Sequence, residues 1–335
     1  MRRRRIGDLE VSVLGIGGNT FGTDFFGPGC DAGTVTRILR TALDAGVDLV
    51  DTAEEYSITS FLGEGHSEEL IGRALGSRRD EAVISTKFLD EDADDPDRRG
   101  AARIVAAVEA SLTRLGTDRI DLYQQHFPGP DTPVDEVLEA LTRLVTDGKV
   151  REIGWCNATA EQVDDAAGVA ARSGCRPFRS CQLQFSLLER PADELLGALA
   201  RSDTAVLAYF PLASGLLSGK YSRGLPPPPG SRLASDALVA TILRDGAMSR
   251  QPLLSDARLA TVDELAAFAA DSGHTLLELA LSWVAAQPGV ASVLTGVTRP
   301  EQVAANAAAM DWDLTPDDLV AVDAIVAREA GAAAS

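Results

Sequence analysis

Cysteine and histidine are scarce in this sequence, which has 4 and 3 of them among its 335 residues. The cysteines are widely spaced and contain no C-x-x-C pair: Cys30, Cys156, Cys175 and Cys181. Structural metals need clusters of thiols and imidazoles, so we expect no metal site. A reducing, cytoplasmic location fits this use of cysteine best.

Positive charge is also in short supply, since 31 basic residues stand against 50 acidic ones and the net charge is −19. Nucleic acids and anionic membranes bind cationic surfaces, so we expect neither as a partner. The apolar runs stay well short of the roughly 18 residues that a membrane-spanning helix needs. Arg2–Arg5 are followed by no apolar core, so no signal peptide is predicted. Any anionic ligand must be held by a few local cations.

Short β-branched segments alternate with longer segments of helical periodicity about eight times along the chain. The predicted strands are Val13–Ile16, Val47–Val50, Ala82–Ser85, Ile120–Gln124, Glu152–Trp155, Ser180–Gln184, Ala205–Tyr209 and Ala291–Leu294. The predicted helices are Thr34–Ala45, Glu68–Leu75, Ala101–Leu115, Val134–Thr146, Ala160–Ala171, Ala192–Ala200, Arg258–Ala270, Leu276–Ala286 and Arg299–Ala309. Eight such units in about 300 residues favour a (β/α)8 TIM barrel over a doubly wound sheet of about five or six strands.

Three segments lie outside this repeat. The first dozen residues resemble a β-hairpin that plugs the barrel floor, and Thr315–Glu329 is predicted to be an extra C-terminal helix with Thr315 as its N-cap. Residues 221–252 contain a proline run and a polar stretch, which is typical of a lid or a binding loop. We expect a single domain over residues 1–335.

Titratable residues end three neighbouring predicted strands. Asp51 ends the second strand and Tyr56 follows in the next loop, while Lys87 ends the third strand. His126 ends the fourth strand. Because the active sites of such barrels lie at the carboxyl ends of the strands, we expect these four side chains to meet.

These residue types together suit the donation of a proton. A phenol with an ordinary pKa of about 10 is a weak acid at neutral pH, and a nearby ammonium lowers that pKa. Lys87 would supply the ammonium for Tyr56, and Asp51 would keep Lys87 charged and oriented. Neutral His126 would hydrogen-bond a substrate carbonyl oxygen and steer it to Tyr56. Taken singly, each residue also has an ordinary structural explanation, so the argument depends on their joint arrangement.

With these residues in view, nearly the whole chain resembles the aldo-keto reductase superfamily. The resemblance is carried, beside Lys87, by Asp51–Tyr56, Gly65–Gly72, Leu122–His126, Ile153–Asn157, Gln182–Leu188, Ala208–Leu212 and Gly215–Tyr221. The last of these resembles the branch of bacterial oxidoreductases and potassium-channel β-subunits. The resemblance implies NADPH-dependent reduction of an aldehyde or ketone, with Tyr56 as proton donor and Asp51, Lys87 and His126 in support.

The resemblance also implies a set of residues that contact NADP(H). Asn157 and Gln182 match residues that bind the nicotinamide carboxamide, and Tyr209 matches the ring on which nicotinamide stacks. The remaining expected contacts, from the first strand to the adenosine end, are Gly18, Asn19, Thr20, Asp51, Cys156, Leu212, Ser214, Gly215, Lys220, Ser231, Arg232, Gly296, Thr298, Gln302 and Asn306.

The adenosine end has a signal of its own. Thr298 and Glu301 fit the S/T-x-x-E form of a capping box, which places a helix start beside Arg299. Helix N-termini present free amides to phosphate, although a plain cap explains the pattern equally well. Arg299 would favour a 2′-phosphate and hence NADP over NAD.

The sequence departs from many relatives at three places. Cys156 replaces a serine and puts a thiol near the reaction centre, although a small buried filler is the simpler explanation. Ala305 replaces a glutamate that binds adenine, which puts that contact in doubt. Residues 57–64 lengthen the loop after Tyr56 and should border the mouth of the pocket.

Aromatic and apolar residues after the strands are the candidate walls of a substrate pocket. The rings are Phe21, Phe25, Phe61, Phe88, Phe127, Trp155 and Phe210. They favour a moderately hydrophobic or sugar-like carbonyl compound. Because aromatic residues also fill interiors, we expect about half of these rings to belong to the core.

Two other functions are compatible with the same residues. One is a regulatory or redox-sensing module that binds NADP(H) and turns over slowly. The other is a Schiff-base lyase with Lys87 as nucleophile, but Asp51 would then have to leave that amine uncharged. The sequence leaves the physiological substrate, the reaction direction and the oligomeric state open.

Overall fold

The computed structural model describes residues 1–23, 29–56, 65–89, 100–129, 132–234 and 254–333. Eight parallel strands close into a barrel in the order β10-β3-β4-β5-β6-β7-β8-β9. Their bounds are β3 (Leu14–Gly17), β4 (Leu49–Asp51), β5 (Val83–Phe88), β6 (Ile120–Gln125), β7 (Val150–Cys156), β8 (Ser180–Gln184), β9 (Ala205–Tyr209) and β10 (Val290–Gly296). The predicted (β/α)8 barrel is therefore confirmed.

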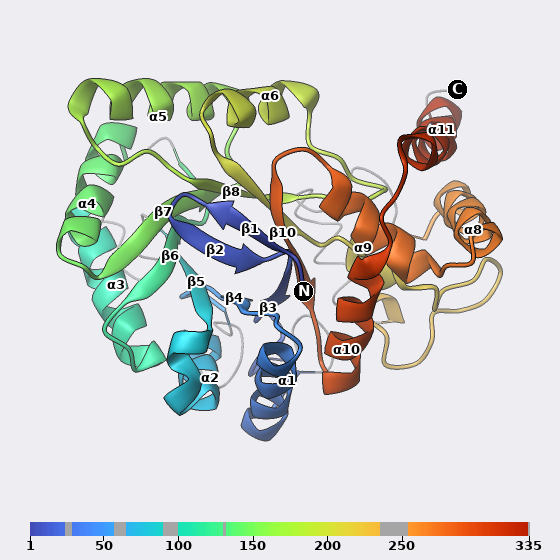
Figure 1. Ribbon diagram of the computed structural model, residues 1–335, viewed down its shortest axis with the longest axis horizontal. Coiled ribbons are helices and arrows are strands. Elements are labelled where there is room, and N and C mark those ends of the chain that lie inside the picture. Colours follow the sequence, from blue (N-terminus) through green and yellow to red (C-terminus); the bar gives the residue numbers. More distant parts are fainter. Residues whose placement is uncertain (24–28, 57–64, 90–99, 130–131, 235–253, 334–335) are drawn as a thin grey trace.

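Helices surround this barrel on its outer side (Figure 1). They are α1 (Ala32–Asp44), α2 (His66–Leu75), α3 (Gly100–Leu115), α4 (Val134–Thr146), α5 (Ala160–Ser173), α6 (Asp193–Arg201), α8 (Asp256–Asp271), α9 (Leu276–Ala286), α10 (Pro300–Ala308) and α11 (Pro316–Ala333). Short 3-10 turns are η1 (Gly76–Glu81), η2 (Ala213–Ser218), η3 (Arg232–Ala234) and η4 (Ala309–Asp311).

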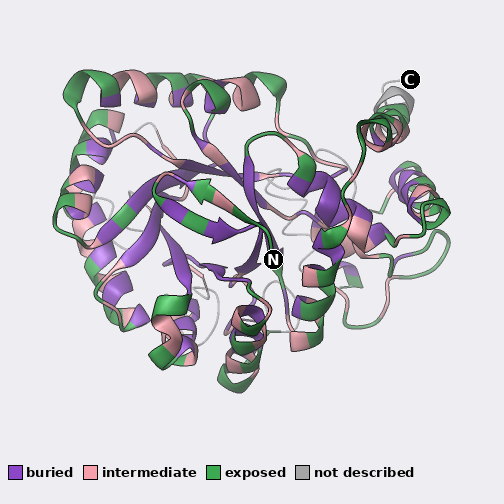
Figure 2. Cartoon of the chain, viewed as in Figure 1, coloured by how far each residue is buried: buried purple, intermediate pink, exposed green. Residues whose placement is uncertain are grey.

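Helix α4 shows why these segments are helical and where they pack. Val137, Leu141 and Leu144 recur at helical spacing and are buried against the strands. Asp135 in the first turn and Arg143 in the last turn have the charges that the helix dipole favours. Figure 2 shows the general result, with buried barrel strands and outer helices exposed on their solvent side.

The N-terminal hairpin closes one end of the barrel. Strands β1 (Arg3–Ile6) and β2 (Leu9–Ser12) pair antiparallel and lie across the near end of the barrel in Figure 1. Ile6 and Leu9 are buried in one cluster with the barrel residues Leu49, Val83 and Leu122. The predicted plug is thus confirmed, and the opposite end of the barrel, where the strands finish, is left for a site.

The extra C-terminal helix also forms as predicted. Thr315 and Asp318 bond reciprocally, because the Asp318 carboxylate accepts from the Thr315 amide at 2.8 Å and the Thr315 hydroxyl accepts from the Asp318 amide at 3.2 Å. The predicted loop 221–252 is described only up to Ala234, and its remainder lies outside the described residues. In the described part of the chain, no helix is long and apolar enough to span a membrane.

Candidate active site

The turn after β4 brings Asp51 and Tyr56 to the end of β5. The amide of Thr52 donates to the Ser85 carbonyl at 2.8 Å, and the amide of Glu54 donates to the Lys87 carbonyl at 3.1 Å. The chain then turns back, with the Tyr56 amide donating to the Ala53 carbonyl at 3.2 Å. These backbone bonds bring the Tyr56 side chain to Lys87.

Lys87 is fully buried and has three oxygen partners. Its Nζ donates to Asp51 Oδ2 at 2.6 Å and to the Thr52 carbonyl at 2.7 Å. The third partner is the Tyr56 hydroxyl, 3.4 Å from Nζ. Ammonium has three N–H donors, so this geometry is that of a protonated amine with every donor directed at an oxygen.

Asp51 is held on its other side by neutral donors. Ser85 Oγ and Gln182 Nε2 each donate to Asp51 Oδ1 at 2.9 Å. The carboxylate is therefore fixed between β5 and β8, and it keeps Lys87 beside Tyr56.

The pKa values of this group follow from burial and charge. Burial alone would lower the pKa of Lys87, but Asp51 together with the other groups around it outweighs burial and holds that pKa above its ordinary value. Burial raises the pKa of Tyr56 well above its ordinary value, while Lys87 acts in the opposite direction. The sequence-based expectation of a lowered pKa at Tyr56 is thus wrong for this state of the protein, because desolvation exceeds the effect of the ammonium.

His126 follows β6 and lies on the other side of Tyr56. Its amide donates to the Phe88 carbonyl at 2.9 Å, which fixes the start of the loop. The His126 and Tyr56 rings meet edge to face with centroids 6.1 Å apart. All four residues predicted to act together therefore converge at the ends of three adjacent strands.

Glu55 was not among the predicted site residues, although its carboxylate contacts Nδ1 of His126. Burial would raise the pKa of this carboxyl, but the charge and hydrogen bond of His126, with Lys87 behind, hold it below its usual value. A second acidic residue directly before Tyr56, on a loop that must be buried, was the signal that could have identified it.

A cavity of about 1000 Å³ opens above these residues. Of the predicted site residues, those that line it are Asn19, Thr20, Asp51, Tyr56, His126, Phe127, Asn157, Gln182, Tyr209, Phe210, Leu212, Ser214, Gly215, Lys220, Ser231, Arg232, Gly296, Thr298 and Gln302. Gly18, Lys87, Cys156 and Asn306 are not in the lining. This volume is at the upper end of small-molecule sites, as an extended ligand requires.

Cys156 lies under the cavity rather than in its wall. The side chain is buried, and burial raises the pKa of its thiol well above the ordinary value, with Lys87 acting in the opposite direction. A neutral, buried thiol is the small filler that the simpler explanation describes. Among the described residues, no group of three or more His, Cys, Asp or Glu side chains could hold a metal ion.

Amide and phenol groups form one end of the cavity. The Tyr209 hydroxyl donates to Asn157 Oδ1 at 2.9 Å, and Asn157 Nδ2 donates to the His126 carbonyl at 3.2 Å. Asn157 has a positive φ of 57°, a conformation that asparagine tolerates better than most residues. These bonds fix the Tyr209 ring and the Asn157 amide beside Gln182 at the cavity floor.

Basic residues form the other end. Burial lowers the pKa of Lys220, and the charges of Arg232 and Arg299 lower it further, so the three cations are close enough to repel one another. Ser214 and Gly215 have positive φ values of 59° and 93° in η2, a strained turn for the serine. The φ of Gly215 lies in the region that favours glycine, and a Cβ there would come within 2.9 Å of Lys220 Nζ and displace the amine.

This arrangement fits an anionic dinucleotide. The three cations repel one another, and an anionic ligand between them would offset that repulsion. Asn19 Oδ1 and Ser231 Oγ are buried and have no hydrogen-bond partner among the described residues, and both residues line the cavity. Buried polar atoms of this kind need partners, which the amide, hydroxyl and phosphate groups of a ligand supply.

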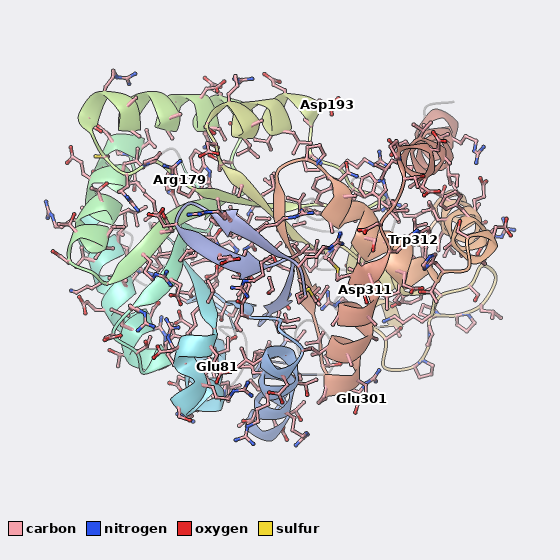
Figure 3. The ribbon with its side chains drawn as sticks, viewed as in Figure 1. Glu81, Arg179, Asp193, Glu301, Asp311 and Trp312 are labelled. Atoms are coloured by element: carbon pink, nitrogen blue, oxygen red, sulfur yellow. The ribbon has the colours of Figure 1, made fainter. Side chains whose placement is uncertain are left out.

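The helix start at the adenosine end differs from the prediction. Helix α10 begins at Pro300, and Gln302 rather than Glu301 is its capping side chain. Gln302 Oε1 accepts from the Thr298 amide at 2.7 Å and from the Arg299 amide at 3.1 Å. The predicted box at Thr298 and Glu301 is therefore wrong, because the fixed φ of Pro300 sets the first helical residue one position later. Glu301 instead lies in the first turn of α10 (Figure 3).

Three of the predicted aromatic walls belong to the core. Phe21, Phe88 and Trp155 are 0%, 0% and 2% exposed and do not line the cavity. Phe88 stacks on Tyr123 with centroids 4.9 Å apart, and Trp155 stacks on Phe178 at 4.4 Å. Successive side chains of a strand point to opposite faces. Lys87 and Cys156 face inward, so their neighbours Phe88 and Trp155 face outward. Phe127 and Phe210 do line the cavity, whereas Phe25 and Phe61 lie outside the described residues.

Comparison with known proteins identifies the family of this chain. Residues 13–327 match the model of the aldo/keto reductase family, so the chain belongs to this family of NAD(P)-dependent oxidoreductases. Aldo-keto reductase YhdN of Bacillus subtilis (strain 168) is 32% identical over 328 residues, covering 95% of this chain and 91% of that protein. A putative voltage-gated potassium channel subunit beta of Schizosaccharomyces pombe is 32% identical over 329 residues, covering 95% of this chain and 90% of that protein.

Proposed function

We propose that this protein reduces an aldehyde or ketone to an alcohol with NADPH, using Tyr56 as the proton donor. The observation that carries the proposal is the 3.4 Å approach of the Tyr56 hydroxyl to a buried Lys87 ammonium beneath a large cavity. Family membership supports the same reaction class. The reaction would take place in a single domain over residues 1–335, in the cytoplasm.

NADPH, when bound, supplies the hydride that reduces the carbonyl carbon. The protein supplies the proton, which passes from the Tyr56 hydroxyl to the carbonyl oxygen as negative charge develops on it. An alkoxide is a far stronger base than a phenolate, so a phenol with a raised pKa still donates to it. Lys87 stabilises the phenolate that remains, and Asp51 prevents the amine from losing its own proton.

The cofactor would be held by residues along the whole cavity. Asn157 and Gln182 are suited to the nicotinamide carboxamide, and the Tyr209 ring to one face of the nicotinamide. Lys220 and Arg232 are suited to the pyrophosphate, and Arg299 to a 2′-phosphate. The preference for NADP follows from Arg299, and equal dissociation constants for NADPH and NADH would contradict it.

The substrate would enter beside Phe127 and Phe210, the two phenylalanines among the described residues that line the cavity. Phe127 is 54% exposed and stacks on the His126 ring with centroids 4.4 Å apart. Such an exposed ring offers a flat apolar surface, which supports a moderately hydrophobic or sugar-like carbonyl compound as substrate.

A panel of aldehydes, ketones and aldoses tests the reaction. We expect NADPH oxidation with at least one member and its loss in Tyr56→Phe, which keeps the ring and removes only the hydroxyl. Retained turnover in Tyr56→Phe would refute Tyr56 as the acid.

The relatives named as potassium channel β-subunits support a second candidate, a module that binds NADP(H) and turns over slowly. Single-turnover oxidation of bound NADPH by a reactive aldehyde separates the two functions, because only an efficient reductase completes it rapidly. The contacts of Lys87 with Asp51 and Thr52 weigh against a Schiff base at that amine.

A further inference from the structure

Glu55 and His126 are in direct contact at the wall of the cavity. The Glu55 carboxylate contacts Nδ1 of His126, and the two side chains are only 18% and 12% exposed. Both residues line the cavity. The second carboxylate oxygen, Oε2, and His126 Nδ1 are both buried without a regular hydrogen bond among the described residues. The imidazole is therefore the group that this carboxylate meets on the cavity side, and the protons shared between them decide the charge of the couple.

The charged groups around this couple are arranged in pairs. On one side, Asp51 and Lys87 form the buried pair that contacts Tyr56. Behind the loop, Glu54 is paired with Arg103, at 2.7 Å between oxygen and nitrogen. On the β7 side, the neighbour of His126 is the neutral Asn157 amide, which donates to its backbone carbonyl. The buried thiol of Cys156 is a further titratable neighbour of Tyr56 and Glu55.

The position of the imidazole proton decides what His126 offers to a substrate. A neutral imidazole has one N–H, and with Nδ1 donating to Glu55 its Nε2 is a bare acceptor. A carbonyl oxygen is also only an acceptor, so it gains nothing from that nitrogen. An imidazolium has both protons, and it donates from Nδ1 to Glu55 and from Nε2 to the carbonyl at once.

We propose that Glu55 is a positioning residue that holds His126 as an imidazolium, in place of the neutral imidazole expected from the sequence, with its Nε2–H directed to the substrate carbonyl. The carboxylate compensates the imidazolium, so that Tyr56 stands between two neutral ion pairs, Asp51 with Lys87 and Glu55 with His126. Without Glu55, two cations would face the phenol with one carboxylate between them, and the imidazole would lose its proton. The kinetic consequence of this role rests on the proposed carbonyl reduction, whereas the charge on His126 does not.

The charge on His126 can be measured directly, because the chain has only 3 histidines and ring ¹⁵N shifts distinguish imidazolium from neutral imidazole. The variant is Glu55→Gln, which keeps the shape and an acceptor oxygen but removes the charge. Loss of an opposite charge in contact should lower the ratio of imidazolium to imidazole at His126 at least about tenfold. An unchanged ratio would overturn the proposal.

Glu69→Gln is the matched control, because Glu69 Oε2 lies 3.5 Å from Nδ1 of another histidine, His66. It should change the His66 signal and leave the His126 ratio at its native value. Glu55→Asp keeps the charge and should retain more imidazolium than Glu55→Gln. Equal ratios in the Asp and Gln variants would show that the carboxylate charge is not what matters, and would also overturn the proposal.

The pH profile of kcat/KM gives the functional readout. In Glu55→Gln the alkaline fall in kcat/KM should begin about one pH unit lower than in the native protein, with Glu55→Asp between them. A profile that keeps its native shape in Glu55→Gln, while Tyr56→Phe is inactive, would reject the role of Glu55 and leave the proposed reaction intact. Turnover that survives in Tyr56→Phe would instead reject the proposed function, and the ¹⁵N ratio would still decide the charge on His126.

Discussion

Replacing Lys87 by methionine removes a buried charge with little change in the length of the side chain. The ammonium contacts Asp51 at 2.6 Å and the Tyr56 hydroxyl at 3.4 Å, and the lysine is fully buried. One substitution therefore acts on two quantities, the rate of proton donation and the free energy of unfolding, and the structure predicts a different size for each.

The effect on rate follows from the distance to Tyr56. A unit charge 3.4 Å from a phenolate is worth about 5 kcal/mol at an effective dielectric constant of about 20. Only the transition state has phenolate character, so this energy is lost from kcat and not from substrate binding. We expect kcat for carbonyl reduction to fall between about a thousandfold and ten-thousandfold.

The effect on stability follows from Asp51, which keeps its charge and loses its counter-ion. Breaking a buried pair from one side costs about 3 to 5 kcal/mol. In Asp51→Asn/Lys87→Met neither charge remains, and Ser85 and Gln182 can still donate to the side-chain oxygen at position 51. We expect the double variant to recover most of the stability and none of the activity.

Chemical denaturation and steady-state kinetics on the two single variants and the double variant measure both effects. Lys149→Met is the control. Lys149 is partly exposed and pairs with Glu109 rather than with a residue of the site. Stability losses that simply add in the double variant, or a kcat in Lys87→Met within tenfold of native, would refute the reasoning.

Three further predictions test separate parts of the structure. Burial raises the pKa of Glu54 from 4.5 to about 7. Between these two pH values the folded state keeps a proton that the unfolded chain has released. The free energy of unfolding therefore falls as the pH rises from 4.5 to about 7. Glu54→Gln should remove this fall, about 2.5 kcal/mol between pH 5 and pH 8 in denaturation experiments; an unchanged slope would contradict the assignment. Gly72→Ala should destabilise the protein by at least about 2 kcal/mol, because the new Cβ in α2 would lie 2.2 Å from the Leu115 carbonyl oxygen. Gly197→Ala in α6 is the control and should stabilise the protein by up to about 1 kcal/mol. Denaturation shifts of the same sign in both variants would show that the backbone at Leu115 moves aside. Lys220→Met should weaken NADPH binding at least about tenfold in fluorescence titrations with little change in kcat; equal dissociation constants would exclude Lys220 as a phosphate contact.

The barrel and the four converging residues could be predicted because they depend on local patterns. The change from β-branched to helical segments predicts where the strands end. Strands β8 and β9 have the bounds that the sequence predicts. Once the barrel is recognised, Asp51, Lys87 and His126 must lie near one another, because adjacent parallel strands end at the same face. No tertiary detail is needed for that step.

The errors concern side-chain direction and solvation, which depend on neighbours distant in sequence. Phe88 directly follows Lys87, so only one of the two can face inward, yet the sequence-based prediction placed both side chains at the site. The pKa of Tyr56 depends on a competition between burial and the Lys87 charge, and sequence shows the charge but not the burial. Glu55 escaped notice because its partner His126 is brought to it only by the pairing of β5 with β6.

The acidic surface and the basic end of the cavity act at different ranges. A net charge of −19 repels an anionic dinucleotide at a distance, but salt screens that repulsion beyond about 8 Å at physiological ionic strength. Arg232 is half-buried, and it lines the cavity together with Lys220, so a phosphate within the cavity meets both cations at a range shorter than the screening length. Repulsion from the surface therefore affects mainly the rate at which the cofactor arrives, whereas the lifetime of the complex depends on these few cations.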